Sequence, residues 1–176
     1  MTRWHGDAME MSCRVLNADD FHRMYPRMVE DRLLWTIWPQ YPDDWWTEEK
    51  FVALLSARDS VVVGVEVDGE LGGFLHLWPY CGSEFTKAGE VGVCAFRKYF
   101  PIAPQICRAV VRYVFSSFDC SCLIGHIPVH NIHALRMLES VGFMKVCRVP
   151  EMGYFARKDR FADGWLVKAV PESREV

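Results

Sequence analysis

Residues 35–46 hold the densest group of side chains that could bind a ligand. Five aromatic rings and two carboxylates share this segment: Trp35, Trp38, Tyr41, Trp45, Trp46, Asp43 and Asp44. Aromatic faces attract ammonium and guanidinium cations, and neighbouring carboxylates strengthen that attraction. The segment therefore predicts a cage for an amine substrate. Two alternatives stay open, namely a loop held down by its own Trp side chains and a contact between subunits.

A second group of side chains has the types that bind zinc. His126, His130 and His133 follow Cys120 and Cys122 in the sequence. Zinc needs ligands that converge on one point, but these histidines fall on a predicted strand, a loop and a helix. The chain also contains no CxxC pair. We therefore expect no metal site.

Composition limits the classes of partner. The 176 residues correspond to about one domain. The 20 basic and 23 acidic residues leave a net charge of −3, so the chain has no basic field for nucleic acid or an anionic membrane. No apolar run is long enough to cross a membrane, and no hydrophobic signal region opens the chain. Seven cysteines, mostly inside apolar runs, favour a reducing, cytoplasmic setting.

The elements of the first half are predicted from periodicity and turn signals. A strand is expected at 11–16. A helix should follow Asn17, with Pro26 kinking it or dividing it in two, and Thr47 should cap a second helix. Strands are expected at 61–67, 71–78 and 88–96, the first two joined by a tight turn at Asp68-Gly69.

In the second half, Pro104 suits the first turn of a helix that begins near 103. The stretch 120–127 indicates a buried parallel strand. A helix at 131–141 should end at Gly142, and strands at 143–149 and 161–170 should close the chain. These elements predict one domain over residues 1–176 with an α+β (mixed α/β) fold. We expect a central mixed sheet of about seven strands, flanked by about four helices.

Asn131, Ala134, Gly142 and Phe143 carry a resemblance to a known family. Their spacing, together with the order of the elements over about residues 11–170, resembles the GNAT superfamily of acetyl-CoA-dependent N-acetyltransferases. The strand at 123–129 is also similar to the family's fifth strand. In physical terms, two parallel strands that splay apart leave backbone groups free, and the amides of pantetheine can pair with them. A pyrophosphate then fits the N-terminus of the next helix.

The resemblance implies a set of residues that contact acetyl-CoA. Backbone groups near Val93 and Ala95 would hold the thioester oxygen, and Asn131 and Ala134 would lie beside the coenzyme. Asn131 could equally serve only as a helix cap. The pyrophosphate loop would include these residues: Lys98, Tyr99, Phe100, Ile102 and Ala103. The loop departs from the family's pattern because Lys98 replaces Gln or Arg and Pro101 replaces the first Gly, which removes a backbone donor.

The resemblance also implies catalytic roles. Glu90 would act as a base through water, although it could be only a surface residue at a strand end. In many family members, a Tyr at the position of Leu138 acts as the general acid. Leu138 cannot donate a proton. The wall of the acceptor site would be formed by four indoles: Trp35, Trp38, Trp45 and Trp46.

We therefore expect acetyl transfer from acetyl-CoA to a primary amine. The alternative is an inactive GNAT-fold protein that serves binding or assembly, as in divergent members from phage and prophage genomes. It would form a homodimer or contact a protein partner through the Trp-rich segment. A third hypothesis is an enzyme with an unusual acyl donor, because Phe100 and Pro101 could reshape the donor site.

Overall fold

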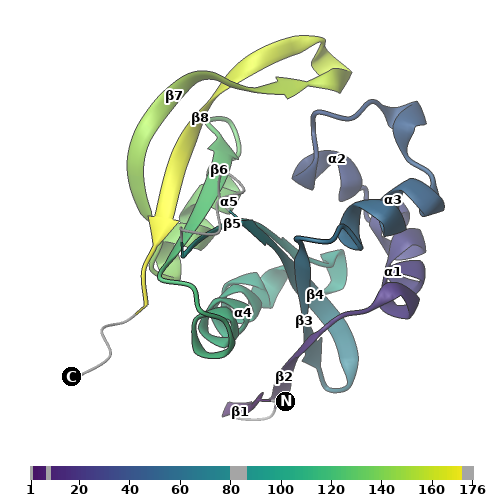
Figure 1. Ribbon diagram of the computed structural model, residues 1–176, viewed down its shortest axis with the longest axis vertical. Helices are drawn as coiled ribbons and strands as arrows, with labels where there is room; N and C mark the ends of the chain where they lie inside the picture. Colours follow the sequence, from purple (N-terminus) through teal and green to yellow (C-terminus); the bar gives the residue numbers. More distant parts are fainter. Residues whose placement is uncertain (1, 7–8, 80–86, 172–176) are drawn as a thin grey trace.

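The structure, a computed structural model, describes residues 2–6, 9–79 and 87–171, and its strands form one sheet (Figure 1). The sheet contains eight strands in the order β1-β2-β3-β4-β5-β6-β8-β7. Only β5 and β6 run parallel; the other neighbouring strands are antiparallel. The predicted α+β fold with a mixed central sheet is confirmed, with one strand more than the expected number in the part of the chain that is described.

The bounds of the elements are as follows. The strands are β1 (Thr2–Gly6), β2 (Met9–Val15), β3 (Val61–Val67), β4 (Glu70–Pro79), β5 (Ala88–Ala95), β6 (Cys122–Pro128), β7 (Met144–Phe155) and β8 (Arg160–Ala169). The α-helices are α1 (Ala18–Glu30), α2 (Leu34–Ile37), α3 (Glu48–Leu55), α4 (Ala103–Ser117) and α5 (Ile132–Ser140). The short 3₁₀ helices are η1 (Asp43–Trp45), η3 (Arg97–Ile102) and η4 (Ala156–Lys158).

The helices cover the sheet in two layers. Figure 1 shows α1, α2 and α3 on one side of the sheet and α4 and α5 on the other. A Cβ atom on Gly92 of β5 would lie 3.6 Å from Ile37 of α2, whereas one on Gly73 of β4 would lie 2.9 Å from Ile106 of α4. Gly92 therefore faces the first layer and Gly73 faces the second. No side chain fits at Gly73, because its Cβ would also lie 2.5 Å from the Cys94 carbonyl oxygen.

Local signals account for most element boundaries. Asp68 and Gly69 have φ angles of 51° and 82°, as the tight turn between β3 and β4 requires. Gly142 ends α5 with a φ of 98°, and Pro104 lies in the first turn of α4. Pro26 lies inside α1, which continues without a break; the prediction of two separate helices is therefore wrong.

Three features differ from the sequence prediction. Residues 2–6 form β1, an edge strand for which the sequence shows no alternating pattern. The segment predicted as irregular from residue 35 contains part of α2 and all of η1, because burial of Leu34 and Trp38 stabilises turns that local propensity does not favour. The turn after β5 is the 3₁₀ helix η3.

Asp20 organises the start of α1. The side chain of Asn17 accepts the Asp20 N–H, and the Asp20 carboxylate accepts the Asn17 N–H in return. The carboxylate is 3% exposed and also accepts hydrogen bonds from Arg14 at 2.7 and 2.8 Å and from Arg23 at 2.7 Å. These contacts, led by Arg14, hold the pKa of Asp20 well below its usual value.

We expect Asp20→Ala to lower the free energy of unfolding by about 2 kcal/mol, because Arg14 and Arg23 lose the charged acceptor of three hydrogen bonds and the Asn17 N–H loses its acceptor. Urea denaturation at pH 7 measures the loss. The folded pKa is depressed, so the stabilisation by Asp20 is present at neutral pH and declines as pH falls below about 4. The wild-type and Ala stability curves should therefore converge in acid; parallel curves would contradict the role of the ionised carboxylate.

Two observations bear on the expected setting of the protein. No helix in the described ranges is long and apolar enough to cross a membrane. The six cysteines within those ranges are free thiols, and Cys81 lies outside them. Burial raises the pKa of Cys13 to about 11, so this thiol is an unreactive part of the core.

Candidate active site

The parallel strands β5 and β6 separate after a short ladder. Their register contains only the pairs Ala88–Cys122, Gly89–Leu123 and Glu90–Ile124. β4 continues to pair with β5 as far as Ala95, and β8 continues to pair with β6 as far as Pro128. The sheet therefore opens into a V between residues 91–95 of β5 and residues 125–128 of β6. The splay that the GNAT resemblance implies is present.

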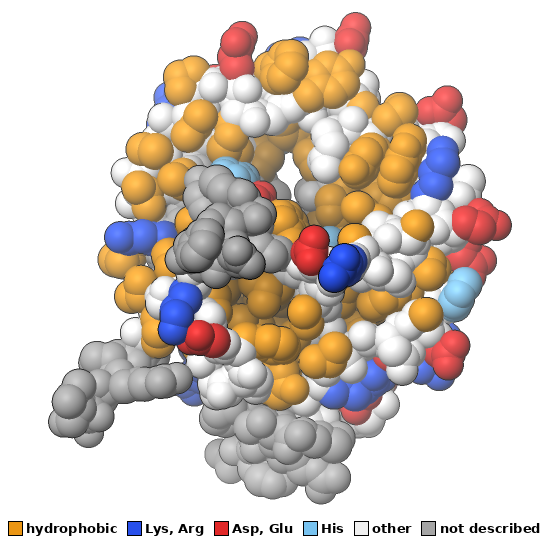
Figure 2. Space-filling view, viewed as in Figure 1, with side chains coloured by type: hydrophobic (Ala, Val, Ile, Leu, Met, Phe, Trp, Pro, Cys, Tyr) orange, Lys and Arg blue, Asp and Glu red, His pale blue; other side chains and the backbone are white. Residues whose placement is uncertain are grey.

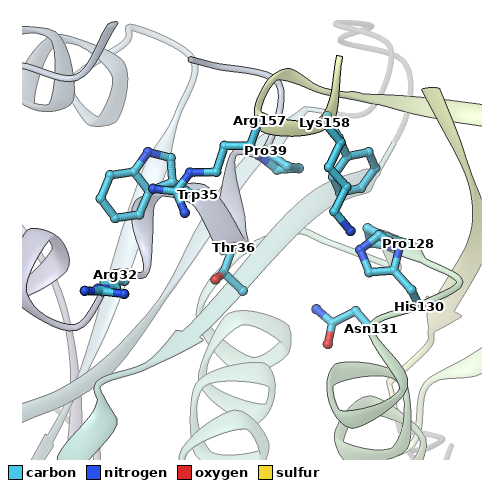
Figure 3. Close-up of a pocket in the computed structure, with 10 residues that line it drawn as sticks. Arg32, Trp35, Thr36, Pro39, Pro128, His130, Asn131, Arg157 and Lys158 are labelled. Carbon is cyan, nitrogen blue, oxygen red and sulfur yellow. The ribbon is translucent and has the colours of Figure 1, made fainter. Parts of the chain in front are cut away.

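A cavity of about 330 Å³ lies near the end of β6. The molecule is hollowed between the β7–β8 hairpin and α2 (Figure 2). Figure 3 shows Arg32, Trp35 and Thr36 on one side of the cavity and Pro128, His130 and Asn131 on the other. Ten residues line it: Arg32, Trp35, Thr36, Pro39, Pro128, His130, Asn131, Phe155, Arg157 and Lys158.

Glu90 and His126 form a pair across the vertex of the V. His126 Nδ1 lies 3.0 Å from Glu90 Oε1, and the two side chains are 35% and 25% exposed. The hydrogen bond from His126 is the main reason why the pKa of Glu90 is lowered, and Trp78 contributes another. Glu90 is therefore a carboxylate at neutral pH that orients an imidazole. Neither side chain lines the cavity, but Pro128, two positions after His126, does.

His126 is a residue whose partnership the sequence did not predict. The sequence suggests only a metal-ligating role for it. The signal was present in the register: alternation along a strand puts residues 124 and 126 on one face, and a parallel neighbour then brings residue 90 to that face. Finding it required the pairing of two strands that lie far apart in the sequence.

The predicted pyrophosphate loop is the 3₁₀ helix η3, and several of its backbone donors are already bonded. The N–H groups of Arg97, Tyr99 and Ala103 donate to Asp31, Phe96 and Phe100 respectively. The Lys98 ammonium pairs with the Glu70 carboxylate and lies 5.1 Å from the Tyr99 ring centre. Tyr99 is buried, whereas Phe100 is 52% exposed. The amides of Tyr99 and Ala103 are thus already hydrogen-bonded within the chain, and the role of this segment as a pyrophosphate loop stays a prediction.

The remaining predicted donor-site residues lie on β5 and α5. Val93 and Ala95 belong to the half of β5 that pairs with β4 but not with β6, and they are partly buried against the core, as is Ile102 at the end of η3. Asn131 lines the cavity and also caps α5, because its Oδ1 accepts the Ala134 N–H at 3.2 Å. The capping role considered for Asn131 is therefore present, and its contact with the coenzyme stays a prediction. Leu138 is 4% exposed and contributes to the core.

The four predicted substrate-wall indoles separate in the structure. Trp35 lines the cavity, but Trp38 and Trp46 are buried in the core, where they pack at 5.5 Å between ring centres. Trp45 stacks on Tyr41 at 4.0 Å. Only Trp35 of the four lines the cavity, because Trp38 and Trp46 are buried in the core and Trp45 is partly buried against it. The alternative that the segment packs itself down describes most of it.

No group of three or more His, Cys, Asp or Glu side chains converges as a metal site in the described part of the chain. His126 pairs with Glu90, and His130 contacts Phe155 at 5.0 Å between ring centres.

Comparisons with known proteins give no match in sequence and clear matches in structure. No protein-family model and no curated protein matches the chain. A spermidine N-acetyltransferase from Vibrio cholerae, solved with CoA and spermine, superposes with a TM-score of 0.74 at 16% identity over 91% of this chain and 95% of that one.

Two further solved structures agree. A ribosomal-protein-S5-alanine acetyltransferase from Vibrio fischeri gives a TM-score of 0.73 at 14% identity over 100% of both chains. A GNAT-family acetyltransferase from Streptococcus pneumoniae gives 0.69 at 14% identity over 91% of this chain and 98% of that one. The splayed mixed sheet and these superpositions together show that the chain has the fold of the GNAT acetyltransferases.

Proposed function

We propose that this protein transfers an acetyl group from acetyl-CoA to a primary amine. The observation that carries the proposal is the splay of β5 and β6, which begins after Glu90 and Ile124. Beyond that point the facing edges of the two strands have no partner strand for their N–H and C=O groups. An extended ligand that contains amides, such as the pantetheine arm of acetyl-CoA, can hydrogen-bond to such edges.

The neighbouring groups suit aminolysis of a thioester. The amine nitrogen attacks the carbonyl carbon, the C–N bond forms, and the C–S bond breaks to release CoA as a thiolate. A base must remove a proton from the amine. The His126 ring, oriented by Glu90 through Nδ1, keeps Nε2 available for that proton. In this proposal, backbone N–H groups near Val93 and Ala95 stabilise the developing oxyanion.

The leaving thiolate departs without a dedicated acid in this proposal. Leu138 is buried and has no proton to donate. Thiols have pKa values near 8.5, so a thiolate is a tolerable leaving group at neutral pH. Reaction in the cytoplasm, where acetyl-CoA is available, belongs to the same proposal.

A second candidate function is a binding or assembly role without catalysis. The specific observation in its favour is η3, where the N–H groups of Arg97, Tyr99 and Ala103 are bonded internally and Pro101 has none. A pyrophosphate therefore meets fewer donors at the start of α4 than the family's loop implies. The same structure also suits an acyl donor other than acetyl-CoA, held chiefly through the splay.

Thermal unfolding with and without acetyl-CoA tests the proposal. A ligand of the native state at about 100 times its dissociation constant adds about 2.7 kcal/mol of stability. For a chain of this size we expect a rise in melting temperature of roughly 5 to 10 °C. Release of CoA thiol on addition of amines then measures transfer. No shift at millimolar acetyl-CoA would contradict the proposal and favour the binding role.

Asn131→Asp provides a matched variant for this experiment. Asp caps a helix as well as Asn does, so α5 and the melting temperature of the free protein should be unchanged. The substitution removes the amide donor in the cavity and adds a negative charge there. We expect weaker acetyl-CoA binding by about tenfold. Unchanged affinity would show that Asn131 serves only as the cap.

A further inference from the structure

The charged side chains that line the cavity all have one sign. Arg32, Arg157 and Lys158 are basic, and no Asp or Glu is present among the lining residues. The overall charge of the chain is −3, so this concentration of positive charge is local. A cavity meant for a polycationic amine would be expected to carry carboxylates instead.

The features that would hold a cation are already occupied by the protein itself. Arg157 lies 4.0 Å from the Trp35 ring centre and forms hydrogen bonds of 2.6 and 3.0 Å with Asp43. Lys50 lies 5.1 Å from the Trp45 ring centre. One face of Trp35, one face of Trp45 and the Asp43 carboxylate are therefore already used within the fold and are not kept for an incoming ammonium group.

Arg32 and Lys158 are the cations that remain unneutralised. None of the ion pairs formed by described residues includes either of them. Both side chains are exposed and border the cavity from opposite elements, Arg32 after α1 and Lys158 in η4. His130 experiences the same positive charge. Burial, together with the charges of Lys158 and Arg160, lowers the pKa of His130.

Arg32 occupies a backbone position that favours glycine. Arg32 ends α1 with a φ of 57°. Its N–H bonds to Val29 O at 3.1 Å, and the Leu33 N–H bonds to Met28 O at 2.9 Å. This pattern of bonds at a helix end usually has Gly in the left-handed position. A long cationic side chain at that position is unfavourable for the backbone, so its presence points to a contact that the fold alone does not require.

We propose that the acceptor amine carries an anionic group, a carboxylate or a phosphate, which Arg32 and Lys158 bind in this cavity. The inference rests on the proposed acetyl transfer and names its substrate class. Polyamines such as spermidine are then poor acceptors for this protein, in contrast to the spermidine N-acetyltransferase from Vibrio cholerae.

The test compares acceptors that differ by one anionic group. Lysine is paired with cadaverine, and glucosamine 6-phosphate with glucosamine; spermidine completes the set. Release of CoA thiol gives kcat/KM for each. We expect the wild-type protein to prefer the anionic member of at least one pair by about 10- to 100-fold. A preference for the members that lack the anionic group overturns the inference, as does turnover of none of the five acceptors.

Arg32→Gly separates the contact from the fold. Gly suits the φ of this position, so the melting temperature should match or exceed that of the wild type, while the preference for anionic acceptors falls at least about tenfold. Arg32→Lys should keep the preference. Arg58→Gln removes an exposed cation that does not line the cavity and should leave it unchanged. An unchanged preference in Arg32→Gly overturns the inference.

Acetyl-CoA affinity, measured on the same variants, identifies the source of the anion. If Arg32→Gly weakens acetyl-CoA binding and leaves acceptor preference intact, the cations bind the phosphates of the coenzyme and the inference is wrong. If the wild-type protein does not bind acetyl-CoA at all, the proposed function fails first. Binding of acetyl-CoA without discrimination among acceptors means that only the acceptor inference fails.

Discussion

Replacing His126 by Gln is expected to lower kcat by about 10²- to 10⁴-fold, the range that a positioned general base contributes. The structural reason is that His126 Nδ1 lies 3.0 Å from Glu90 Oε1, which leaves Nε2 as the free nitrogen at the vertex of the splay. Glu90→Gln should cause a smaller loss of kcat, because the imidazole remains and only its orientation weakens. Steady-state release of CoA thiol measures both values.

Chemical rescue distinguishes a catalytic role of His126 from a purely structural one. His126→Gly should regain part of its activity when imidazole is added, since a small base can enter the space that the ring leaves. In His126→Gln and Glu90→Gln, acetyl-CoA affinity and melting temperature should stay close to the wild-type values, because the two side chains are partly exposed. Wild-type kcat in His126→Gln, or a larger loss in Glu90→Gln than in His126→Gln, would contradict the assignment of His126 as the base.

The boundaries that sequence predicted well depend on residues whose effect is local. Asp68-Gly69, Pro104 and Gly142 act within one turn, and each appears at the boundary it predicted. The α+β class followed from the order of such elements. The segment from residue 35 was less predictable, because the short helix there depends on burial of Leu34 and Trp38 against distant parts of the chain.

The candidate site was predictable only in part, for the same reason. Glu90 was identified from its place at the start of a strand, and Asn131 from its spacing to Gly142. His126 joins Glu90 only because two strands pair in parallel, and Arg32 and Lys158 meet at one cavity from opposite halves of the chain. The segment 35–46 was interpreted as a cation cage, and the sequence contained no sign that Arg157 would fill that role from within.

His76 is expected to destabilise the protein as pH falls from 6.5 to 4. Its ring is 4% exposed, lies 4.5 Å from the ring centre of Trp78, and has no hydrogen-bond partner at either nitrogen among the described residues. Burial lowers the pKa of His76 to about 4. The unfolded chain, with an ordinary value near 6.5, therefore binds more protons than the folded protein within this window. Stability is then complete above about pH 6.5 and declines below it, by about 2 kcal/mol at pH 5 and about 3 kcal/mol near pH 4.

Urea denaturation at pH 7, 6, 5 and 4.5 measures this decline, and His76→Phe should remove most of it. The variant also replaces two buried polar atoms that lack partners, so its stability at pH 7 should equal or exceed that of the wild type; His76→Leu serves if the larger ring does not fit. His130→Gln is the matched control, because the pKa of His130 shifts in the same direction although its side chain is exposed. The control should keep most of the pH dependence. An equal decline in the wild type and in both His76 variants would contradict this prediction. The acid sensitivity would then arise from groups other than His76.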